Sequence, residues 1–233
     1  MKRRTFIFIN LILLCTLFLS SCETKICVKA TKDGKAEFNF KVQLGTILTE
    51  TIETLALEFE TESTDVFDQE KINDFLIQSD LKKTEVLVED KTSLYLNAEI
   101  PAVENQKMVT ESGSYKISDF IYCSSNELSL KINPDVFQEI VLSMPEETQY
   151  YLDLLMAPVL TNEKISTEEY IDLVATIYGE PLAAEVKAST VKVELSCPDG
   201  MFIKNTKTNK KEFNIPLAQF LCTSEPKEYS IQW

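Results

Sequence analysis

The 233-residue chain contains no histidine, and its only two arginines are Arg3 and Arg4. Without histidine it cannot form a Ser-His-Asp triad, a histidine-ligated metal site or an imidazole acid–base pair. Without arginine after residue 4 it has no guanidinium group for bidentate binding of phosphate or carboxylate. The five glycines are at least eleven positions apart, which excludes glycine-rich phosphate loops and the G-x-S-x-G nucleophile elbow.

The charge balance is strongly acidic, with 23 Lys and Arg against 37 Asp and Glu and a formal net charge of −14. Such a chain is a poor ligand for nucleic acid, so we expect no nucleic-acid partner. It also contains no C-x-x-C pair for zinc and no D-x-D-x-D-G loop for calcium. We therefore expect neither a metal ion nor a dissociable cofactor.

The N-terminal 22 residues carry the strongest signal in the chain. Three positive residues (2–4) precede a nearly apolar stretch of 14 residues (6–19). Because a membrane-spanning helix needs about 20 apolar residues, this stretch is typical of a signal peptide instead. It ends in Leu19-Ser20-Ser21-Cys22, which resembles the lipobox of bacterial lipoproteins: an aliphatic residue, two small residues and a cysteine.

The resemblance implies a diacylglyceryl group on the Cys22 thiol, cleavage between Ser21 and Cys22, and an N-acyl group on the new terminus. It implies a lipid-anchored protein on the non-cytoplasmic side of a bacterial membrane, periplasmic or at the cell surface. Loss of the signal peptide, residues 1–21, removes three positive charges and no acid. The remaining 20 lysines and 37 acids give a charge of −17. Residues 22–25 are expected to form a tether of about 14 Å, which holds the domain close to the membrane.

Residues 26–233 are predicted to form a single α+β domain, an antiparallel sheet with helices packed on one face. Residues 26–42 alternate as a hairpin with a three-residue loop, 32–34, and a left-handed Gly34. Ser166 and Glu169 form a capping box at the start of a helix that ends at Gly179. Further helices are expected over 46–60, 69–79, from 134 and over 147–157, and strands near 84–89, 93–99, 114–122, 127–132, 191–197, 213–215 and 229–233.

Four cysteines other than Cys22 remain after residue 21. An even number in an exported protein is compatible with two disulfides, in any of three pairings, among Cys27, Cys123, Cys197 and Cys222. The alternative is that they are small core residues. Cys197 favours that alternative, because it shares a strand face with Val191, Val193 and Leu195.

One basic segment interrupts the acidic domain. Residues 204–211 contain no acid and four lysines, Lys204, Lys207, Lys210 and Lys211. The pattern of the segment is typical of a hairpin tip. Near an anionic lipid surface, each lysine can contribute about 1 kcal/mol to membrane binding. Together with the short tether, this suggests that the tip faces the membrane. The alternative is an ordinary solvated loop.

These observations favour a non-enzymatic lipoprotein that binds or supports another component of the cell envelope. We expect this component to be an envelope protein, whose identity the sequence does not give. The alternative is a carrier or sensor of an apolar ligand, held in a cavity between sheet and helices. Residues 150–160, the most apolar stretch after the signal, could line such a cavity, form a partner groove or simply be a core helix.

Overall fold

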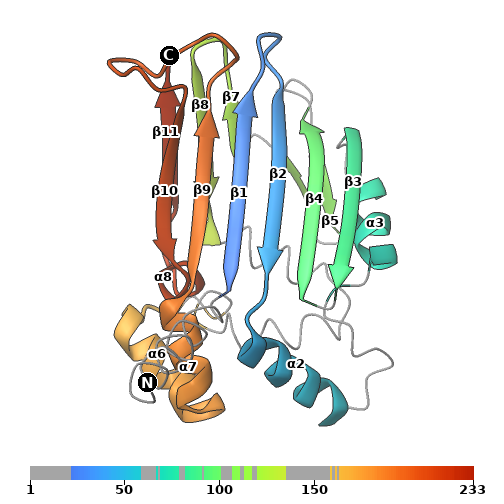
Figure 1. The fold of residues 1–233 in the computed structure, drawn as a ribbon, viewed down its shortest axis with the longest axis vertical. Helices are drawn as coiled ribbons and strands as arrows, with labels where there is room; N and C mark the ends of the chain where they lie inside the picture. The colour runs from blue at the N-terminus through green and yellow to red at the C-terminus, as the bar shows by residue number, and fades with distance from the viewer. Residues whose placement is uncertain are drawn as a thin grey trace, which may run out of the picture.

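The computed structural model describes residues 22–58, 67, 69–78, 82–90, 92–100, 107–110, 113–116, 120–134, 158, 161 and 163–233. These residues form an α+β fold with one large, mostly antiparallel sheet, as predicted (Figure 1). The signal peptide lies outside the described residues. So do nearly all of the helices expected from 134 and over 147–157, and of the apolar stretch 150–160.

The large sheet has six strands, which combine the first four long strands of the described chain with two strands from its C-terminal part. Their order is β10 (Lys210–Pro216), β9 (Thr190–Ser196), β1 (Glu23–Ala30), β2 (Ala36–Gln43), β4 (Ser93–Ile100) and β3 (Lys82–Asp90). All neighbours are antiparallel except β1 and β9, which run in parallel. Strand β1 begins at Glu23, so the tether expected over residues 22–25 is wrong, and no residue separates Cys22 from this strand.

Alternation along each strand gives the large sheet one apolar and one polar face. Val28, Phe38 and Leu195 are paired neighbours on the apolar face. The polar face carries lysines and acids such as Lys25 and Glu194, and no described element covers it.

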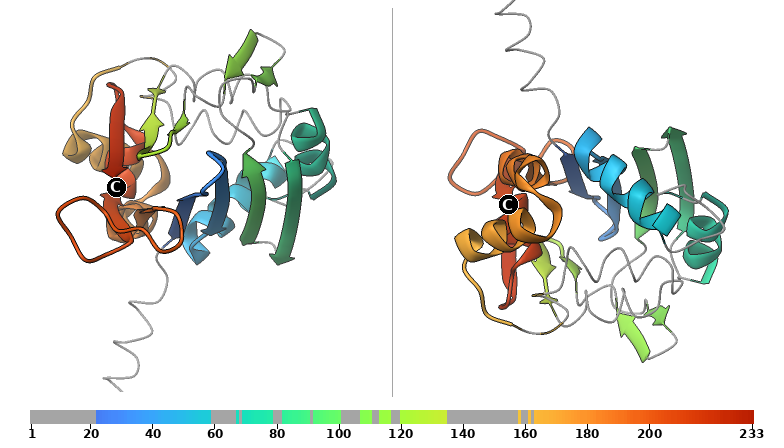
Figure 2. Two further views of the ribbon diagram at one scale, coloured as in Figure 1. Left: turned by 90° about the horizontal axis from the view of Figure 1, so that it is seen from above. Right: turned by 90° about the horizontal axis from the view of Figure 1, so that it is seen from below.

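A second sheet covers part of the apolar face. Its strands are β11 (Lys227–Gln232), β8 (Glu127–Ile132) and β7 (Ile121–Cys123). Side chains of both sheets form one buried cluster, in which Leu128 and Leu195 are fully enclosed. Figure 2 views the two sheets end-on. A separate pair of short strands is β5 (Lys107–Thr110) and β6 (Gly113–Lys116). The single strand expected over 114–122 is therefore wrong, because β6 and β7 belong to different sheets.

Of the five helices among the described residues, four gather at one end of the large sheet, which we call the helical end (Figure 1). They are α2 (Thr46–Glu58), α6 (Thr167–Tyr178), α7 (Glu180–Ala188) and α8 (Leu217–Leu221). They share a second core around Tyr170, Leu182 and Val186, which are nearly inaccessible to solvent. The fifth helix, α3 (Gln69–Gln78), packs on the apolar face beside β3, where Ile72 contacts a third cluster that includes Val86.

Two local predictions are confirmed in detail. The β1–β2 hairpin pairs Ala30 with Ala36, and Gly34 has a φ of 78°, a left-handed conformation that glycine adopts without strain. At the start of α6 the Ser166 hydroxyl accepts from the Glu169 amide at 3.2 Å, and the Glu169 carboxylate accepts from the Ser166 amide at 2.8 Å. These reciprocal bonds satisfy amides that the first helical turn leaves without partners.

Candidate functional site

Cys22 lies at the helical end, immediately before β1. Its backbone N–H donates to the Ser189 hydroxyl at 2.9 Å, and its thiol accepts from the Gly45 amide at 3.0 Å. The residue is 4% exposed in the full chain and packs with the core of the helical end. The candidate lipid-attachment residue is therefore held by two segments that lie far from it in the sequence.

Glu185 is the charged residue at the centre of this site. Its carboxylate accepts from the Ile47 amide at 3.1 Å and from the Leu48 amide at 2.9 Å, although the residue is only 6% exposed. A carboxylate in this position satisfies two free amides at the N-terminus of α2 and complements the helix dipole. Glu185 therefore caps α2 from a helix about 140 residues further along the chain.

Gly45 allows this capping because it has no side chain. A Cβ built on Gly45 would overlap all three atoms of the Glu185 carboxyl group. The same glycine offers its amide to the Cys22 thiol, and the Ser189 hydroxyl donates to the Glu185 carbonyl at 2.6 Å. Cys22, Gly45, Glu185 and Ser189 thus form one connected group, which we call the anchor cluster.

The anchor cluster does not resemble a nucleophilic centre. Burial raises the pKa of the Cys22 thiol, and the nearby negative charge of Glu185 raises it further. A thiol with a raised pKa carries little thiolate at neutral pH and is a weak nucleophile. Sequence reasoning did not identify Gly45 or Glu185, because neither residue belongs to a local motif.

The basic segment 204–211 lies at the other end of the sheet. Its first six residues end the connection between β9 and β10, at the top of Figure 1, and Lys210 and Lys211 begin β10, whereas Cys22 precedes β1 at the bottom. Because β1 and β9 run in parallel, the seven residues of β9 separate the two sites by about 23 Å. The prediction that this tip faces the anchoring membrane is therefore wrong.

The β9–β10 connection, which we call the basic loop (residues 197–209), has an ordered backbone. The Cys197 amide donates to the Asn209 carbonyl at 2.9 Å, and the Ile203 amide donates to the Thr208 carbonyl at 2.8 Å. A further bond, from the Lys204 amide to the Gln232 carbonyl at 2.7 Å, joins the loop to β11. These bonds fix the loop relative to the second sheet.

The four lysines of residues 204–211 differ in their surroundings. Lys210 lies 3.1 Å from the Glu194 carboxylate on the polar face of the sheet. Lys211 points to the other face, where its ammonium lies 4.8 Å from the centre of the Phe213 ring. Lys204 and Lys211 line a shallow pocket of about 310 Å³ with five uncharged residues, Ile203, Asn205, Ser230, Ile231 and Gln232.

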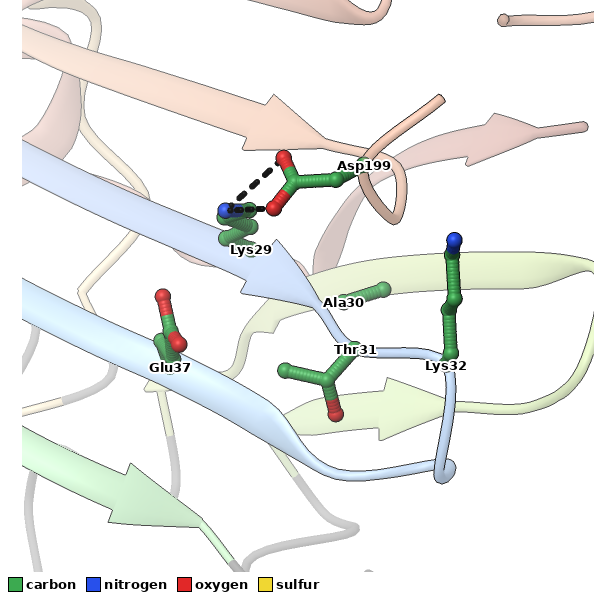
Figure 3. Close-up of a pocket in the computed structure, with 6 residues that line it drawn as sticks. All are labelled: Lys29, Ala30, Thr31, Lys32, Glu37 and Asp199. Atoms are coloured by element: carbon green, nitrogen blue, oxygen red, sulfur yellow. Dashed lines mark hydrogen bonds and ion pairs between the residues drawn. The ribbon is translucent and has the colours of Figure 1, made fainter. Parts of the chain in front are cut away.

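A second shallow pocket, of about 210 Å³, lies at the same end of the sheet (Figure 3). Lys29 crosses it to pair with Asp199 of the basic loop, with N–O distances of 3.0 and 3.1 Å. This hydrogen bond raises the pKa of Lys29. Lys32 extends from the hairpin turn and is not joined to that ion pair (Figure 3). Both carboxylates that line the pocket, Asp199 and Glu37, are close to lysines, so its charges are largely balanced.

The described cysteines are all free thiols, so neither of the two possible disulfides forms among them. They lie in different parts of the fold. Cys27 is on the polar face of β1, and Cys222 packs in the core of the helical end. Cys123 donates to the Lys35 carbonyl at 3.5 Å, and Cys197 donates to the Asn209 carbonyl at 3.0 Å. The alternative of small core residues holds for Cys197 and Cys222, which are buried, whereas Cys27 and Cys123 are only partly buried.

Within the described ranges, no three Cys, Asp or Glu side chains come together as a group that could hold a metal ion. In the same ranges, no helix has the length and apolar character needed to cross a membrane. Comparison of the chain with protein-family models, curated proteins and solved structures finds no match in any of the three. The anchor cluster and the basic loop are therefore the features from which a function can be proposed.

Proposed function

We propose that this chain is a bacterial lipoprotein, anchored through Cys22 on the non-cytoplasmic side of a membrane, whose work is to bind or support another envelope component. The observation that carries the proposal is the position of Leu19-Ser20-Ser21-Cys22 relative to the fold. The motif ends immediately before β1, whose first residue is Glu23. Cleavage before Cys22 would therefore remove no part of the described sheet.

Lipid on Cys22 would have a direct structural consequence. Thioether formation replaces the thiol proton, and the attached glyceryl group needs a route to solvent from a residue that is 4% exposed. The proposal therefore expects the contacts of the Cys22 sulfur with the Gly45 amide and the Glu185 carboxylate, at 3.0 and 3.9 Å, to change in the mature protein. The Glu185 cap on α2 can remain, because its two bonds to Ile47 and Leu48 do not involve Cys22.

A binding role for the surface is favoured over a carrier role by the shape of the two pockets described above. Both are shallow, and both are lined by charged or polar residues at one end of the sheet. A carrier of an apolar ligand needs an enclosed cavity with mainly apolar walls. The space between the two sheets is instead filled by side chains such as Val193 and Leu128, each of which has no exposed surface.

The anchor is tested by expressing the full chain in a bacterium with labelled fatty acid, with and without globomycin, an inhibitor of lipoprotein signal cleavage. We expect label on the wild type, loss of label in Cys22→Ser, and a larger, uncleaved product with globomycin. Cys27→Ser is the matched control, since Cys27 is the next cysteine along the chain and should leave the label unchanged. An unlabelled wild-type protein, or equal labelling of Cys22→Ser, would contradict the proposal.

The binding role is tested separately, by crosslinking intact cells and purifying the wild-type protein from their membranes. We expect a defined envelope component to be captured by the wild type and to be captured less well by variants of the surface that contacts it. Recovery of the protein without any crosslinked partner would count against a binding role and leave the anchor assignment intact.

A further inference from the structure

We propose that the basic loop and the pocket beside it form a docking site for an acidic segment of a partner protein that also presents an apolar side chain. This inference extends the proposed function by naming the chemistry of the partner. It rests on three properties of the described residues: unpaired lysines, exposed apolar side chains and a fixed backbone.

The first property is a local excess of positive charge. The domain after residue 21 carries a charge of −17, yet residues 204–211 hold four lysines and no acid. Lys210 is engaged by Glu194, whereas Lys204 and Lys211 line a pocket that contains no carboxylate side chain. The nearest acids on the adjoining strands lie outside this lining: Glu212 points to the opposite face of β10, and Glu228 lies two residues before Ser230. Positive charge at this position attracts a negatively charged partner.

The second property is an exposed apolar surface on the same loop. Phe202 is 60% exposed, the highest value among the large apolar side chains of the described residues, and its neighbour Met201 is 37% exposed. Aromatic and methionine side chains are enriched at protein interfaces, where burial of a large apolar group supplies much of the binding energy. An apolar side chain beside the acids of the partner would cover this surface.

The third property is preorganisation. Five backbone bonds within or from the loop hold residues 197–209 in place, including those from Met201 to Pro198 and from Thr206 to Ile203. Asn205 has a φ of 63°, a left-handed conformation that asparagine tolerates better than most residues. A loop that is already ordered loses little conformational entropy when a partner binds.

Protein carboxylates fit this site better than phosphate. No arginine occurs after Arg4, so the site has no guanidinium group for bidentate phosphate recognition. Its two lysines are single point charges, and Asn205 and Gln232 offer side-chain amides that can pair with a peptide backbone. The site also lies at the end of the sheet opposite Cys22, so an anchored protein would present it away from its own membrane.

The probe is a 12-residue peptide, capped at both ends, with glutamates on each side of a central Leu-Phe pair. Its binding to the full chain, purified from membranes in neutral detergent, is followed by the fluorescence of Trp233. This is the only tryptophan of the chain and the residue after Gln232 of the pocket. We expect saturable binding that weakens as salt is added. The same peptide with glutamine in place of glutamate should bind at least about tenfold more weakly.

Substitutions identify the residues of the protein that bind the peptide. Lys204→Ala combined with Lys211→Ala should weaken binding about tenfold, which corresponds to about 1.4 kcal/mol. Phe202→Ala should weaken it by about fivefold or more. The matched control is Lys25→Ala combined with Lys192→Ala, which removes the same charge from the polar face of the sheet. There both lysines pair with acids, and affinity should stay within about twofold.

Three results would overturn the inference: no saturation up to about 1 mM peptide, equal weakening by the control pair, or Lys204- and Lys211-dependent binding to anionic vesicles but not to the peptide. The lipid state of Cys22 is measured on the same samples. Peptide binding that depends on the basic loop, in a protein without lipid, would refute the anchor assignment and support this inference. A lipidated protein that does not bind the peptide would support the anchor assignment and refute this inference.

Discussion

Replacement of Glu185 by alanine removes the carboxylate that joins α7 to the start of α2. The hydrogen bonds that the Ile47 and Leu48 amides donate to the carboxylate, at 3.1 and 2.9 Å, are lost, and both amides remain in a largely buried site. Loss of an N-terminal helix cap costs about 0.5–2 kcal/mol, and bonds to charged groups are at the strong end of the range. Removal of a buried charge returns part of this cost. We therefore expect the free energy of unfolding to fall by about 2–3 kcal/mol.

Urea unfolding of the full chain, followed by circular dichroism, measures this change. Glu185→Gln keeps the volume and one acceptor oxygen, so its effect should fall between those of the wild type and the alanine variant. Glu50→Ala is the matched control, because Glu50 is an exposed glutamate on the helix that Glu185 caps. Its effect should stay within about 0.5 kcal/mol. If Glu185→Ala and Glu50→Ala destabilise the protein equally, the capping account is refuted.

Two further substitutions test the close approach of Gly45 to Glu185 and the capping box at the start of α6. Gly45→Ala should destabilise the wild type, because its Cβ would overlap the Glu185 carboxyl group, and the effect should shrink in a Glu185→Ala background. Additive urea midpoints would contradict the steric reason. The pKa of Glu169 is lowered by its bonds to Ser166, first the backbone bond and then the side-chain bond. The advantage of the wild type over Glu169→Gln should therefore be present above pH 4.5 and disappear as the pH falls below it. An advantage unchanged down to pH 3 would contradict this.

Features set by neighbouring residues could be predicted from the sequence. The β1–β2 register follows from alternation between residues 26 and 42, and the left-handed Gly34 follows from the loop length that the alternation requires. The capping box at Ser166 and the helix end at Gly179 were predicted correctly for the same reason, since each depends on residues within one helical turn.

Features set by distant residues could not be predicted. The parallel pairing of β1 with β9 joins residues about 167 positions apart, and it alone decides that the basic loop and Cys22 lie at opposite ends. Local pattern says nothing about such pairings, so the tip was assigned to the wrong end. Glu185 was missed for the same reason, because its partners on α2 are known only once the chain is folded. The placement of residues 113–116 and 121–123 in two different sheets likewise depends on which strands lie beside them.

The most direct test of the central proposal is the mass of the N-terminal peptide of the full chain after expression in a bacterium and extraction from its membranes. The lipoprotein assignment predicts that the first residue is Cys22 and that it carries a diacylglyceryl thioether. A peptide that still joins Ser21 to Cys22, or a Cys22 with a free thiol, would contradict it.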